Sequence, residues 1–409
     1  MKILHTSDWH IGRALHTHKR YPEYEAFLNW LAGLIEDQDI DVLLVAGDIF
    51  DNSTPTNRAQ ELYYRFLCRV ASPAHRQVVV IAGNHDSPSF LDAPRELLKF
   101  LNVHVVGTVS PTPADEVLLL AGPDGAVRLI VCAVPYLRDR DIRTSEAGEN
   151  MEDKERKLIE GIRTHYRLVC EAAEAKRARL KKPVPIVGMG HLFTAGSRTT
   201  ESDGVRELYI GSLAQVRTDV FPPCIDYLAL GHLHIPQKVA GADFIRYSGS
   251  PLPIGFGEAE QEKIVIIIEF SDGAPQVSTI PVPRFQELQT LRGDWPTIAR
   301  GIAALKSGGS KAWLEIIYDG EEIVGNLAER LAEAVADTNL EILVTRNNRV
   351  LERAMNMTAV AETLDDLDVM DVFNRCMEAH EVPAEQCQAL LSAYQEIIVS
   401  LNEADLQAE

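Results

Sequence analysis

Residues 78–86 read Val-Val-Val-Ile-Ala-Gly-Asn-His-Asp, an apolar run followed by a glycine and three polar side chains. A short run rich in valine and isoleucine predicts a strand that is buried on both faces. The glycine after it lets the chain turn sharply and lets other groups come close to the backbone. The polar residues therefore leave the carboxyl end of a buried strand, which is where open α/β sheets place their ligand sites.

Four other apolar runs end in the same way, each in a residue type that binds metal ions. They are residues 1–4 before Asp8 and His10, residues 42–46 before Gly47 and Asp48, residues 185–189 before Gly190 and His191, and residues 227–230 before Gly231, His232 and His234. Packing needs alone do not produce five such strand exits in one chain. We therefore expect their polar residues to converge at one edge of a sheet.

The converging residues are sufficient to hold two divalent cations. They are Asp8, His10, Asp48, Asn84, His191, His232 and His234. A mixture of imidazole, carboxylate and amide ligands favours Mn²⁺, Fe or Zn²⁺ over Mg²⁺, which prefers oxygen and water. A pair of such cations activates a bound water and neutralises charge on phosphoryl oxygens. The sequence therefore predicts hydrolysis of a phosphoester.

Individual roles follow from position in these motifs. Asp48 is the expected bridge between the cations, because its motif carries a single carboxylate after the glycine. His85 stands next to a ligand but one residue out of phase, which suits a general acid that protonates the leaving alkoxide. Asp86 is expected either to orient His85 or to cap the next helix. His5 is expected in the core or around the site, and His165, which has no partner motif, at the surface or in a helix cap.

Residues 1–282 alternate short strands with helices, as in a layered α/β domain. Apolar periodicity predicts helices over residues 24–35, 55–70, 92–101 and 151–181. After the last ligand motif, three strands follow without intervening helices, at residues 244–247, 264–270 and 277–280. This order fits two sheets sandwiched between helices. The sequence Pro281-Val282-Pro283 marks the expected end of the domain.

Two smaller segments follow. Residues 283–350 predict a small α/β module: strand 285–291, helix 296–305, strand 312–318, helix 324–335 and strand 340–345. Residues 351–409 predict two amphipathic helices, one from about residue 367 to 380 and one from about 383 to 402. Two such helices cannot bury their apolar faces alone, so we expect them to pack on a partner.

The composition fits a globular protein that works inside the cell. Apolar residues make up 46% of the 409 residues, charged residues 24%, and the six cysteines form no C-x-x-C pair, which favours a reducing compartment. No signal-peptide pattern precedes the first strand, and the apolar stretch 264–270 is too short to cross a bilayer. We therefore expect a cytoplasmic protein with no membrane association.

Charge is distributed unevenly along the chain. The net charge is -20, and residues 351–409 carry 13 acidic against two basic residues, a balance of -11. Such a tail repels polyanions, so a nucleic-acid substrate would have to meet another surface or a partner that supplies positive charge. The basic stretch at residues 138–143 is either a DNA contact or a solvated loop. The same two interpretations apply to His16 and His18.

The order D-x-H, G-D, G-N-H-D, G-H and G-H-x-H resembles that of the calcineurin-like metallophosphoesterases over residues 1 to about 280. The flanking sequences are more specific. They resemble the SbcD family, the nuclease subunits of bacterial SbcCD DNA-repair complexes, and the likeness spans essentially the whole chain. The matching stretches are MKILHTSDWHIG at residues 1–12, VAGDIFD at 45–51, YIGSL at 209–213 and YSGSPLP at 247–253.

This resemblance implies a two-sheet αββα metallophosphoesterase sandwich with a small α/β capping domain and a C-terminal helical pair. It implies a Mn²⁺-dependent nuclease of DNA repair, recombination and replication. Such an enzyme degrades duplex ends 3′ to 5′, cuts single strands and opens hairpins. Asp48 would be shared by two ligand sets, with His85 in catalysis. One set would be Asp8, His10, Asp48 and His234, and the other Asp48, Asn84, His191 and His232.

The resemblance also implies partners. Residues 351–409 would dock on the coiled coil of an SbcC-type ATPase, in a complex of two nuclease and two ATPase subunits associated with the nucleoid, and the nuclease subunits would pair with each other. One position departs from archaeal and eukaryotic relatives, which carry a second functional histidine where this chain has Asp51. The chain also lacks a G-x-x-x-x-G-K-[ST] motif, so ATP binding would belong to the partner.

Two other functions are possible for a chain with these motifs. A small-molecule phosphodiesterase would share the metal chemistry, but it would need neither the second module nor the terminal helices. A non-catalytic scaffold of a repair complex would need no metal ligands, whereas all seven ligand-type residues are present.

Overall fold

The structure, a computed structural model, describes residues 1–71, 76–143, 149–194, 216–270, 275–320, 326–347, 370, 373–374, 377, 387 and 390–395. The chain divides into two compact units, one covering Met1–Phe285 and the other Gln286–Ala404. Most of the predicted C-terminal helical pair lies outside the described residues. None of the helices in the described ranges is long and apolar enough to cross a membrane.

The first unit contains two six-stranded sheets. The strand order of the first sheet is β14-β13-β1-β4-β5-β6, and that of the second is β11-β12-β10-β9-β8-β7. Strands β1, β4, β5 and β6 are parallel, as are β8, β9, β10 and β12, so the carboxyl ends within each set share one edge.

The bounds in the first sheet are β1 Lys2–Thr6, β4 Val42–Ala46, β5 Gln77–Ile81, β6 Val103–Val106, β13 Ile264–Glu269 and β14 Gln276–Pro281. Those in the second sheet are β7 Val117–Ala121, β8 Val127–Ala133, β9 Ile186–His191, β10 Tyr227–Gly231, β11 Gln237–Lys238 and β12 Ile245–Tyr247.

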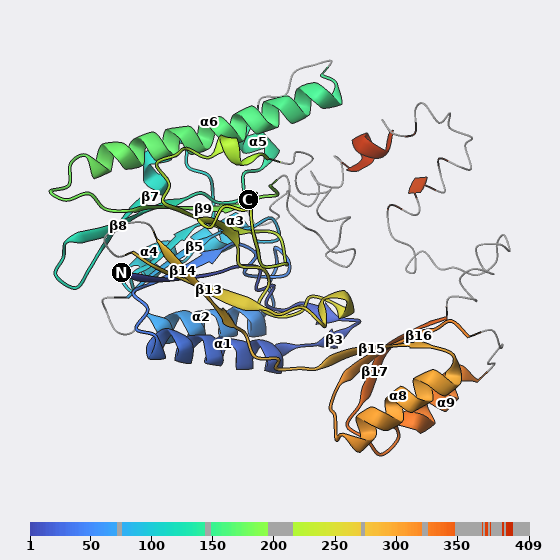
Figure 1. Ribbon diagram of the computed structural model, residues 1–409. Helices are drawn as coiled ribbons and strands as arrows, with labels where there is room; N and C mark the ends of the chain where they lie inside the picture. Colours follow the sequence, from blue (N-terminus) through green and yellow to red (C-terminus); the bar gives the residue numbers. More distant parts are fainter. Residues whose placement is uncertain are drawn as a thin grey trace. The chain divides into compact units, whose positions relative to one another are not determined.

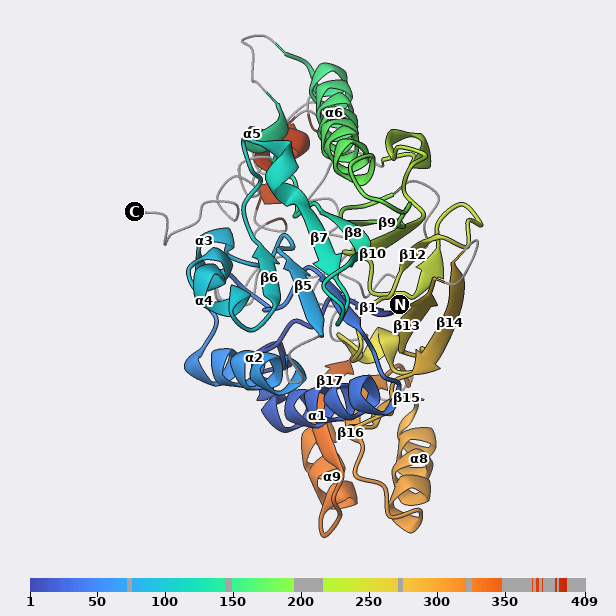
Figure 2. The ribbon, with the colours of Figure 1, turned by 90° about the vertical axis from the view of Figure 1, so that its left-hand side faces the viewer.

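Helices cover the outer face of each sheet (Figure 1). Helices α1 (Tyr21–Asp37) and α2 (Asn57–Val70) lie on the first sheet, and α6 (Met151–Arg177) lies on the second. Figure 2 shows the same layers from the side. The first unit therefore has the predicted αββα architecture, which confirms the fold class.

Three apolar clusters separate these four layers, and β4 shows how one strand serves two of them. Leu43 and Val45 belong to the cluster beneath α1 and α2, whereas Val42, Leu44 and Ala46 belong to the cluster between the sheets. Successive side chains of a strand point to opposite faces, so a strand buried on both faces must be apolar at every position. This is why the run 42–46 contains no polar residue. The third cluster lies between the second sheet and α6.

The helix predicted over residues 92–101 is wrong in its bounds. The structure has two short helices there, α3 (Pro88–Asp92) and α4 (Arg95–Lys99), separated by Ala93 and Pro94. Proline has no N–H to donate and its ring clashes with the preceding turn, so a helix cannot run through it without a break. The hairpin of β2 (Ala14–Leu15) and β3 (His18–Lys19) is among the elements that were not predicted.

The second unit contains the predicted small α/β module. Its sheet has the parallel order β15-β16-β17, with α8 between the first two strands and α9 before the third. Asp294 caps α8, because its side chain accepts from the amide of Thr297 at 3.0 Å. The bounds are β15 Leu288–Gly293, α8 Trp295–Ser307, β16 Trp313–Tyr318, α9 Leu327–Val335 and β17 Glu341–Asn347.

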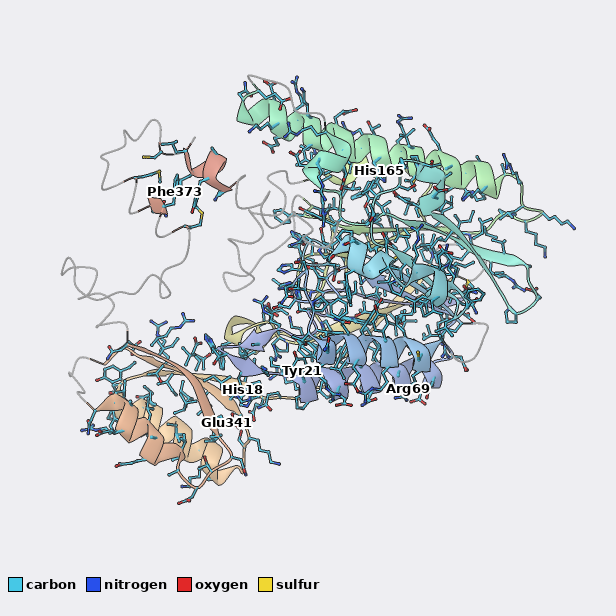
Figure 3. The ribbon with its side chains drawn as sticks, turned by 180° about the vertical axis from the view of Figure 1, so that it is seen from behind. His18, Tyr21, Arg69, His165, Glu341 and Phe373 are labelled. Carbon is cyan, nitrogen blue, oxygen red and sulfur yellow. The ribbon has the colours of Figure 1, made fainter. Side chains whose placement is uncertain are left out.

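Two aromatic residues of the C-terminal segment lie within the described part of the chain. The rings of Phe373 and Tyr394 stack, with centroids 3.9 Å apart and planes 6° from parallel; Phe373 is labelled in Figure 3. Each comes from one of the two helices that the sequence predicts. The contact shows that these two positions, which are 21 residues apart in the sequence, meet in space.

Glycine is required where the two sheets approach each other. A Cβ on Gly231, at the end of β10, would lie 1.9 Å from the carbonyl oxygen of Ala46 at the end of β4. A Cβ on Gly47 would lie 2.3 Å from Nδ1 of His191, and its φ of +88° is one that other residues rarely adopt. The atoms that exclude these side chains belong to neighbouring strand ends. The glycines thus bring the ligand loops together, in addition to allowing the turns.

Replacing Gly231 with alanine is expected to lower the free energy of unfolding by about 1–3 kcal/mol, the usual cost of overpacking a core. Gly33, in the middle of α1, is the matched control, because no atom lies within 4 Å of the position that its Cβ would take. Gly33→Ala should raise stability by up to about 1 kcal/mol, since glycine weakens helix interiors. Denaturant titration measures both effects. Wild-type stability of Gly231→Ala would contradict the close approach of the sheets.

Candidate metal centre

All seven predicted ligand residues lie together where the carboxyl ends of the two sheets meet. The loops that follow β1, β4 and β5 approach from the first sheet, and the ends of β9 and β10 approach from the second. Strands β4 and β5 contact β9, and β4 also contacts β10. Asp8 and His10 are completely buried, and Asp48 and His191 are exposed by no more than 2%. The convergence at one sheet edge that the motif order predicts is present in the structure.

One half of the cluster is formed by Asp8, His10 and His234, whose ligand atoms lie within 4.8 Å of one another. The Nε2 atoms of His10 and His234 are 3.2 Å apart. Two neutral rings cannot both direct lone pairs into this space without repulsion unless a cation or a proton lies between them. Two ligand atoms that each lie about 2.1 Å from one ion and subtend a right angle at it would be about 3 Å apart. The spacing of the two Nε2 atoms therefore suits coordination of one ion.

The other half is formed by Asn84, His191 and His232. The Oδ1 atom of Asn84 lies 3.0 Å from Nε2 of His191 and 3.0 Å from Nδ1 of His232. Asp48 connects the halves, because its Oδ2 atom is 3.3 Å from Nε2 of His191 and 3.6 Å from Nε2 of His10. The donor set consists of imidazole, carboxylate and amide atoms, which fits a pair of divalent cations.

The backbone of the ligand loops adopts conformations that residues other than glycine rarely take. Asp8, His10, Asp48 and His232 have φ values of +53°, +46°, +49° and +106°. Each such residue costs about 1–3 kcal/mol, and such strain clusters at functional sites. Hydrogen bonds between loops hold it in place: the amide of Asp8 donates to the Gly47 carbonyl at 3.0 Å, and that of His10 to the Asp48 carbonyl at 3.0 Å.

Burial and charge set the protonation of the cluster. Burial raises the pKa of Asp8. Burial also opposes ionisation of Asp48, but the neighbouring His191 and His85 outweigh it and hold the pKa of Asp48 well below its usual value. Burial would lower the pKa of His191, yet the Asp48 carboxylate raises it to about 9. Without a cation, a proton on His191 therefore balances the charge of Asp48. Burial lowers the pKa of His10 to about 4, so this ring stays neutral and able to bind.

Asp86 joins two of the ligand loops, a role different from either of those expected. Its carboxylate accepts from the backbone amides of Ile49 at 3.1 Å, Phe50 at 2.9 Å and Gly83 at 2.9 Å. The residue that caps the following helix is Ser87, whose side chain accepts from the amide of Phe90. Burial and the nearby Asp48 raise the pKa of Asp86 to about 6. It ties the Asp48 loop to the loop of Asn84 and His85.

His85 lies at the rim of the cluster and is half-buried, unlike the ligand-type histidines. Its amide donates to Oδ1 of Asp48 at 3.0 Å, and its Nδ1 atom lies 2.9 Å from the backbone carbonyl oxygen of Asp51. The ring meets that of His10 edge-on, with centroids 4.9 Å apart. His85 is thus fixed by its backbone amide and by Nδ1 of its ring.

Other histidines have structural roles. His5 is completely buried between the sheets, with Nδ1 3.1 Å from the Tyr227 hydroxyl and Nε2 3.2 Å from the Leu230 carbonyl oxygen. Its expected place in the core is what the structure shows. The expectation that His165 lies at the surface or in a helix cap is wrong, because it lies in the interior of α6. His165, labelled on α6 in Figure 3, is only 9% exposed, and its Nε2 lies 2.8 Å from the buried carboxylate of Glu116.

The basic stretch at residues 138–143 offers little free positive charge. It forms the short helix α5 (Asp139–Ile142) and its flanks. Arg138 is 7% exposed, and Arg143 pairs with Asp139 and with Glu149. Acidic neighbours thus offset this cluster, which weakens its interpretation as a DNA contact.

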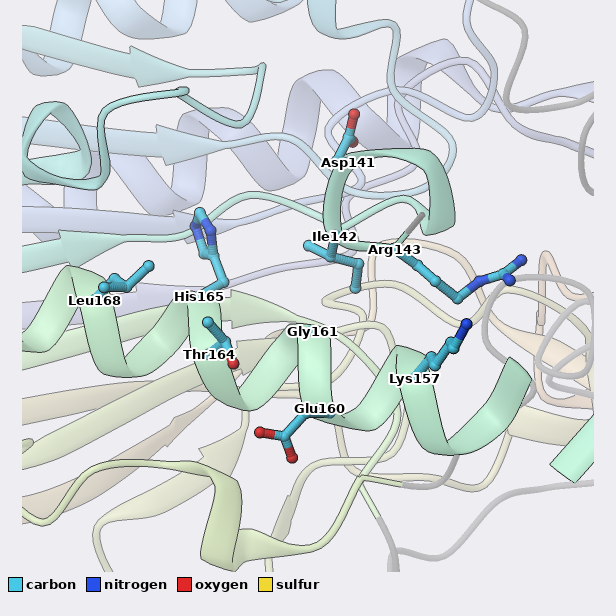
Figure 4. A pocket seen from close by; sticks show the side chains of 9 residues that line it. All are labelled: Asp141, Ile142, Arg143, Lys157, Glu160, Gly161, Thr164, His165 and Leu168. Carbon is cyan, nitrogen blue, oxygen red and sulfur yellow. The ribbon is translucent and has the colours of Figure 1, made fainter. Parts of the chain in front are cut away.

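A cavity of about 450 Å³ lies between α5 and α6, apart from the ligand cluster (Figure 4). Two acidic and two basic side chains line it, so it presents no net charge to a ligand. None of the seven ligand-type residues is among its lining residues, which are Asp141, Ile142, Arg143, Lys157, Glu160, Gly161, Thr164, His165 and Leu168. The chemistry predicted from the sequence therefore belongs to the sheet edge and not to this cavity.

Comparison with known proteins agrees with this geometry. The calcineurin-like phosphoesterase family model matches residues 1–236. The SbcD subunit of the nuclease SbcCD from Escherichia coli K12 is 35% identical over 393 residues, which cover 95% of this chain and 96% of that protein. The chain belongs to the SbcD family. It is a metal-dependent phosphodiesterase and a nuclease subunit.

Further SbcD-family proteins and a second family model extend the match. The SbcD subunit from Rhodobacter capsulatus is 38% identical, and the match covers 69% of this chain and 70% of that protein. The SbcD subunit from Bacillus subtilis is 34% identical, and the match covers 67% of each chain. A family model described as the type 5 capsule protein repressor C-terminal domain matches residues 284–381. The SbcD likeness thus includes the second unit as well as the phosphoesterase unit.

Sequence reasoning did not single out two residues close to the centre. The Asp51 carboxylate lies 3.6 Å from Nδ1 of His10, and Glu258 lies 3.5 Å from Nδ1 of His234. Asp51 was noted only as a departure from other relatives. Glu258 ends a short 3-10 helix, Phe256–Glu258, in an acidic stretch with no recognisable motif, so nothing in the sequence distinguishes it from its neighbours.

Proposed function

We propose that this protein is the DNA nuclease subunit of an SbcCD-type complex, using two divalent cations, most suitably Mn²⁺. The observation that carries the proposal is the Asp48 carboxylate, which stands between two sets of inward-facing ligand atoms. Asp8, His10, Asp48 and His234 would hold one cation. Asp48, Asn84, His191 and His232 would hold the other.

The cations, when bound, would supply an activated water and would offset charge on the phosphoryl oxygens. The chain's own residues arrange the rest. His85 would donate a proton to the leaving 3′ or 5′ oxygen, because its ring is anchored at Nδ1 beside the ligand residues and the residue is only half-buried. The strained loops would keep the ligand side chains in register with one another before substrate arrives.

DNA is the substrate that the family relationship favours, and the proposed activities are those of the family. They are 3′ to 5′ exonuclease action on duplex ends, endonuclease action on single strands, and hairpin opening, in repair, recombination and replication. A DNA substrate would place the protein in the cytoplasm, at the nucleoid. Because the chain carries a net charge of -20, its own affinity for DNA should be weak and should fall steeply with salt.

The test is cleavage of a labelled hairpin duplex by the purified protein with Mn²⁺, compared with His85→Ala. The wild type should cut, and the variant should lose at least about 10²-fold in rate, the usual contribution of a general acid. Both should bind the same number of Mn²⁺ ions. A wild type that hydrolyses nucleotide esters but leaves every DNA intact would instead support a small-molecule phosphodiesterase. A wild type that binds metal and cuts nothing would support a scaffold.

The C-terminal residues are proposed to dock on the coiled coil of an SbcC-type ATPase in a two-plus-two complex, with residues 283–350 as a capping domain that shapes the DNA path. The acidic composition of residues 351–409 suits protein binding better than DNA binding. The stacked pair Phe373 and Tyr394 supports a paired arrangement of the two helices.

Deletion of residues 355–409 should leave a folded protein that binds Mn²⁺ but no longer copurifies with the ATPase. Co-expression and affinity purification measure the association, and circular dichroism checks the fold. The full-length protein is the control. Continued copurification of the truncated protein would contradict the docking assignment.

Pairing of two nuclease subunits is proposed through the outer face of α4. Leu97, Phe100 and Leu101 are 69%, 87% and 38% exposed, whereas Leu98 is buried. Leu97 lies in α4, and Phe100 and Leu101 follow directly after its last residue, Lys99. Exposed apolar side chains gathered in this way mark interaction sites. A second copy of the chain would cover this face.

The double variant Leu97→Asp and Phe100→Asp is expected to sediment as a monomer at concentrations where the wild type is a dimer. A charge at the centre of an apolar interface would have to be buried without a partner. Leu119→Asp is the control, because Leu119 is a leucine of β7 that is 42% exposed and does not belong to the proposed interface. Analytical ultracentrifugation distinguishes the states. Unchanged dimerisation of the double variant would place the interface elsewhere.

A further inference from the structure

The outward-facing nitrogens of the ligand histidines have different surroundings in the two halves of the metal centre. A neutral imidazole that binds a cation through one nitrogen must carry its proton on the other. The group that faces this second nitrogen fixes the tautomer and the ring orientation, and it tunes how strongly the ring binds. Asp51 and Glu258 face two of these rings.

His10 has a carboxylate behind it. Its Nε2 atom faces His234 and Asp48, while its Nδ1 atom lies 3.6 Å from Oδ1 of Asp51. The same carboxylate oxygen accepts from the guanidinium of Arg13 at 3.1 Å. The guanidinium of Arg13 thus holds in place the oxygen that faces the ring.

His234 has a similar arrangement. Its Nδ1 atom lies 3.5 Å from Oε1 of Glu258, a residue with no solvent exposure. The other oxygen of Glu258 accepts from Nζ of Lys263 at 2.5 Å and from the amide of Ile254 at 3.0 Å. Lys263 also donates to the backbone carbonyl of His234 at 3.2 Å. The lysine therefore fixes both the carboxylate and the histidine that it faces.

The rings in the other half have weaker support. The Nδ1 atom of His191 lies 2.9 Å from the carbonyl oxygen of Ala46, a neutral acceptor. The outer Nε2 atom of His232 has no hydrogen-bond partner among the residues that the structure describes. This half also contains Asn84, a neutral ligand, in the place where the first half has the Asp8 carboxylate.

We propose that Asp51 and Glu258 are positioning residues that hold a proton on Nδ1 of His10 and His234, and that they make this half of the centre the tighter cation site. The inference rests on the proposed two-cation centre. Contacts of 3.5–3.6 Å are longer than hydrogen bonds, so the carboxylates act through their charge: each favours a proton on the facing Nδ1 and leaves the Nε2 lone pair for the cation. The cations would therefore bind in order, first beside His10 and His234 and then beside His191 and His232.

The test is a titration of the metal-free full-length protein with Mn²⁺, with free Mn²⁺ followed by electron paramagnetic resonance and heats by calorimetry. The wild type should bind two ions with dissociation constants that differ by at least tenfold. Asp51→Asn and Glu258→Gln should each weaken the tighter class about 10–100-fold, as loss of such supporting groups does. Neither should change the weaker class. His232→Ala should remove the weaker class and leave the tighter one.

Glu116→Gln is the matched control. Glu116 is also a buried carboxylate beside a histidine, at 2.8 Å from His165, but it lies outside the metal centre. This variant should bind both ions as the wild type does, whatever its stability. The Asp51→Asn variant keeps the inference testable if the Glu258 variant fails to fold. The Asp51 side chain is 24% exposed, and asparagine keeps an acceptor for Arg13. Circular dichroism verifies the fold of each.

Three results would overturn the inference: equal affinities in the wild type, unchanged tight binding in both carboxylate variants, or an equal loss in both classes. A third bound ion that Asp51→Asn abolishes would also overturn it, since His10, Asp51 and His85 would then be ligands of a separate site. These outcomes are separable from the nuclease proposal. Ordered binding without any DNA cleavage would refute the nuclease and leave this inference intact, whereas cleavage with equal affinities would do the reverse.

Discussion

Two carboxylates buried side by side, those of Asp8 and Asp48, set the main constraint on this structure. They are exposed by 0% and 2%. Like charges in a medium of low polarity repel strongly, and burying even one ion without compensation costs several kcal/mol. The surrounding imidazoles and a proton on His191 relieve this only in part, because burial lowers the pKa of His10 and of His232 and so keeps both rings neutral. Divalent cations are the compensation that the geometry is built to accept.

The fold meets this constraint by bringing parallel strand ends from two sheets to the same place. Apolar residues on both faces of β4 and its neighbours fill three cores, so polar groups are displaced to the strand ends. Glycine at positions such as 47 and 231 lets those ends touch. The Asp86 carboxylate then joins two of the loops through three backbone amides. The apolar cores thus lie on the faces of the sheets, while four residues with positive φ lie in the loops that carry the ligand side chains.

Much of this could be predicted from the sequence. The strand exits, the convergence of seven ligand-type residues and the four-layer architecture all follow from apolar runs that end in polar residues. These patterns are local, and a parallel sheet converts them into a shared edge without further information. The likeness of the flanking residues to the SbcD family then narrowed the function from a metal-dependent hydrolase to a nuclease subunit.

Other features depend on contacts between distant segments and leave no local pattern. The positive φ of Asp8 and Asp48 comes from hydrogen bonds between two loops that are about 40 residues apart in the sequence. Glu258 faces His234 although the two are far apart in the sequence, and Lys263 contacts both of them. His165 has no partner nearby in sequence, since Glu116 belongs to a different element. The break at Pro94 was visible in the sequence, but apolar periodicity outweighed it in the prediction.

The central claim is that the buried acidic cluster is a cradle for two cations. Crystals of the full-length protein grown with Mn²⁺ would test it by anomalous diffraction at the manganese edge. We predict two anomalous peaks, one beside His10 and His234 and one beside His191 and His232, with the Asp48 carboxylate between them. Peaks located elsewhere, or none at saturating Mn²⁺, would contradict the account.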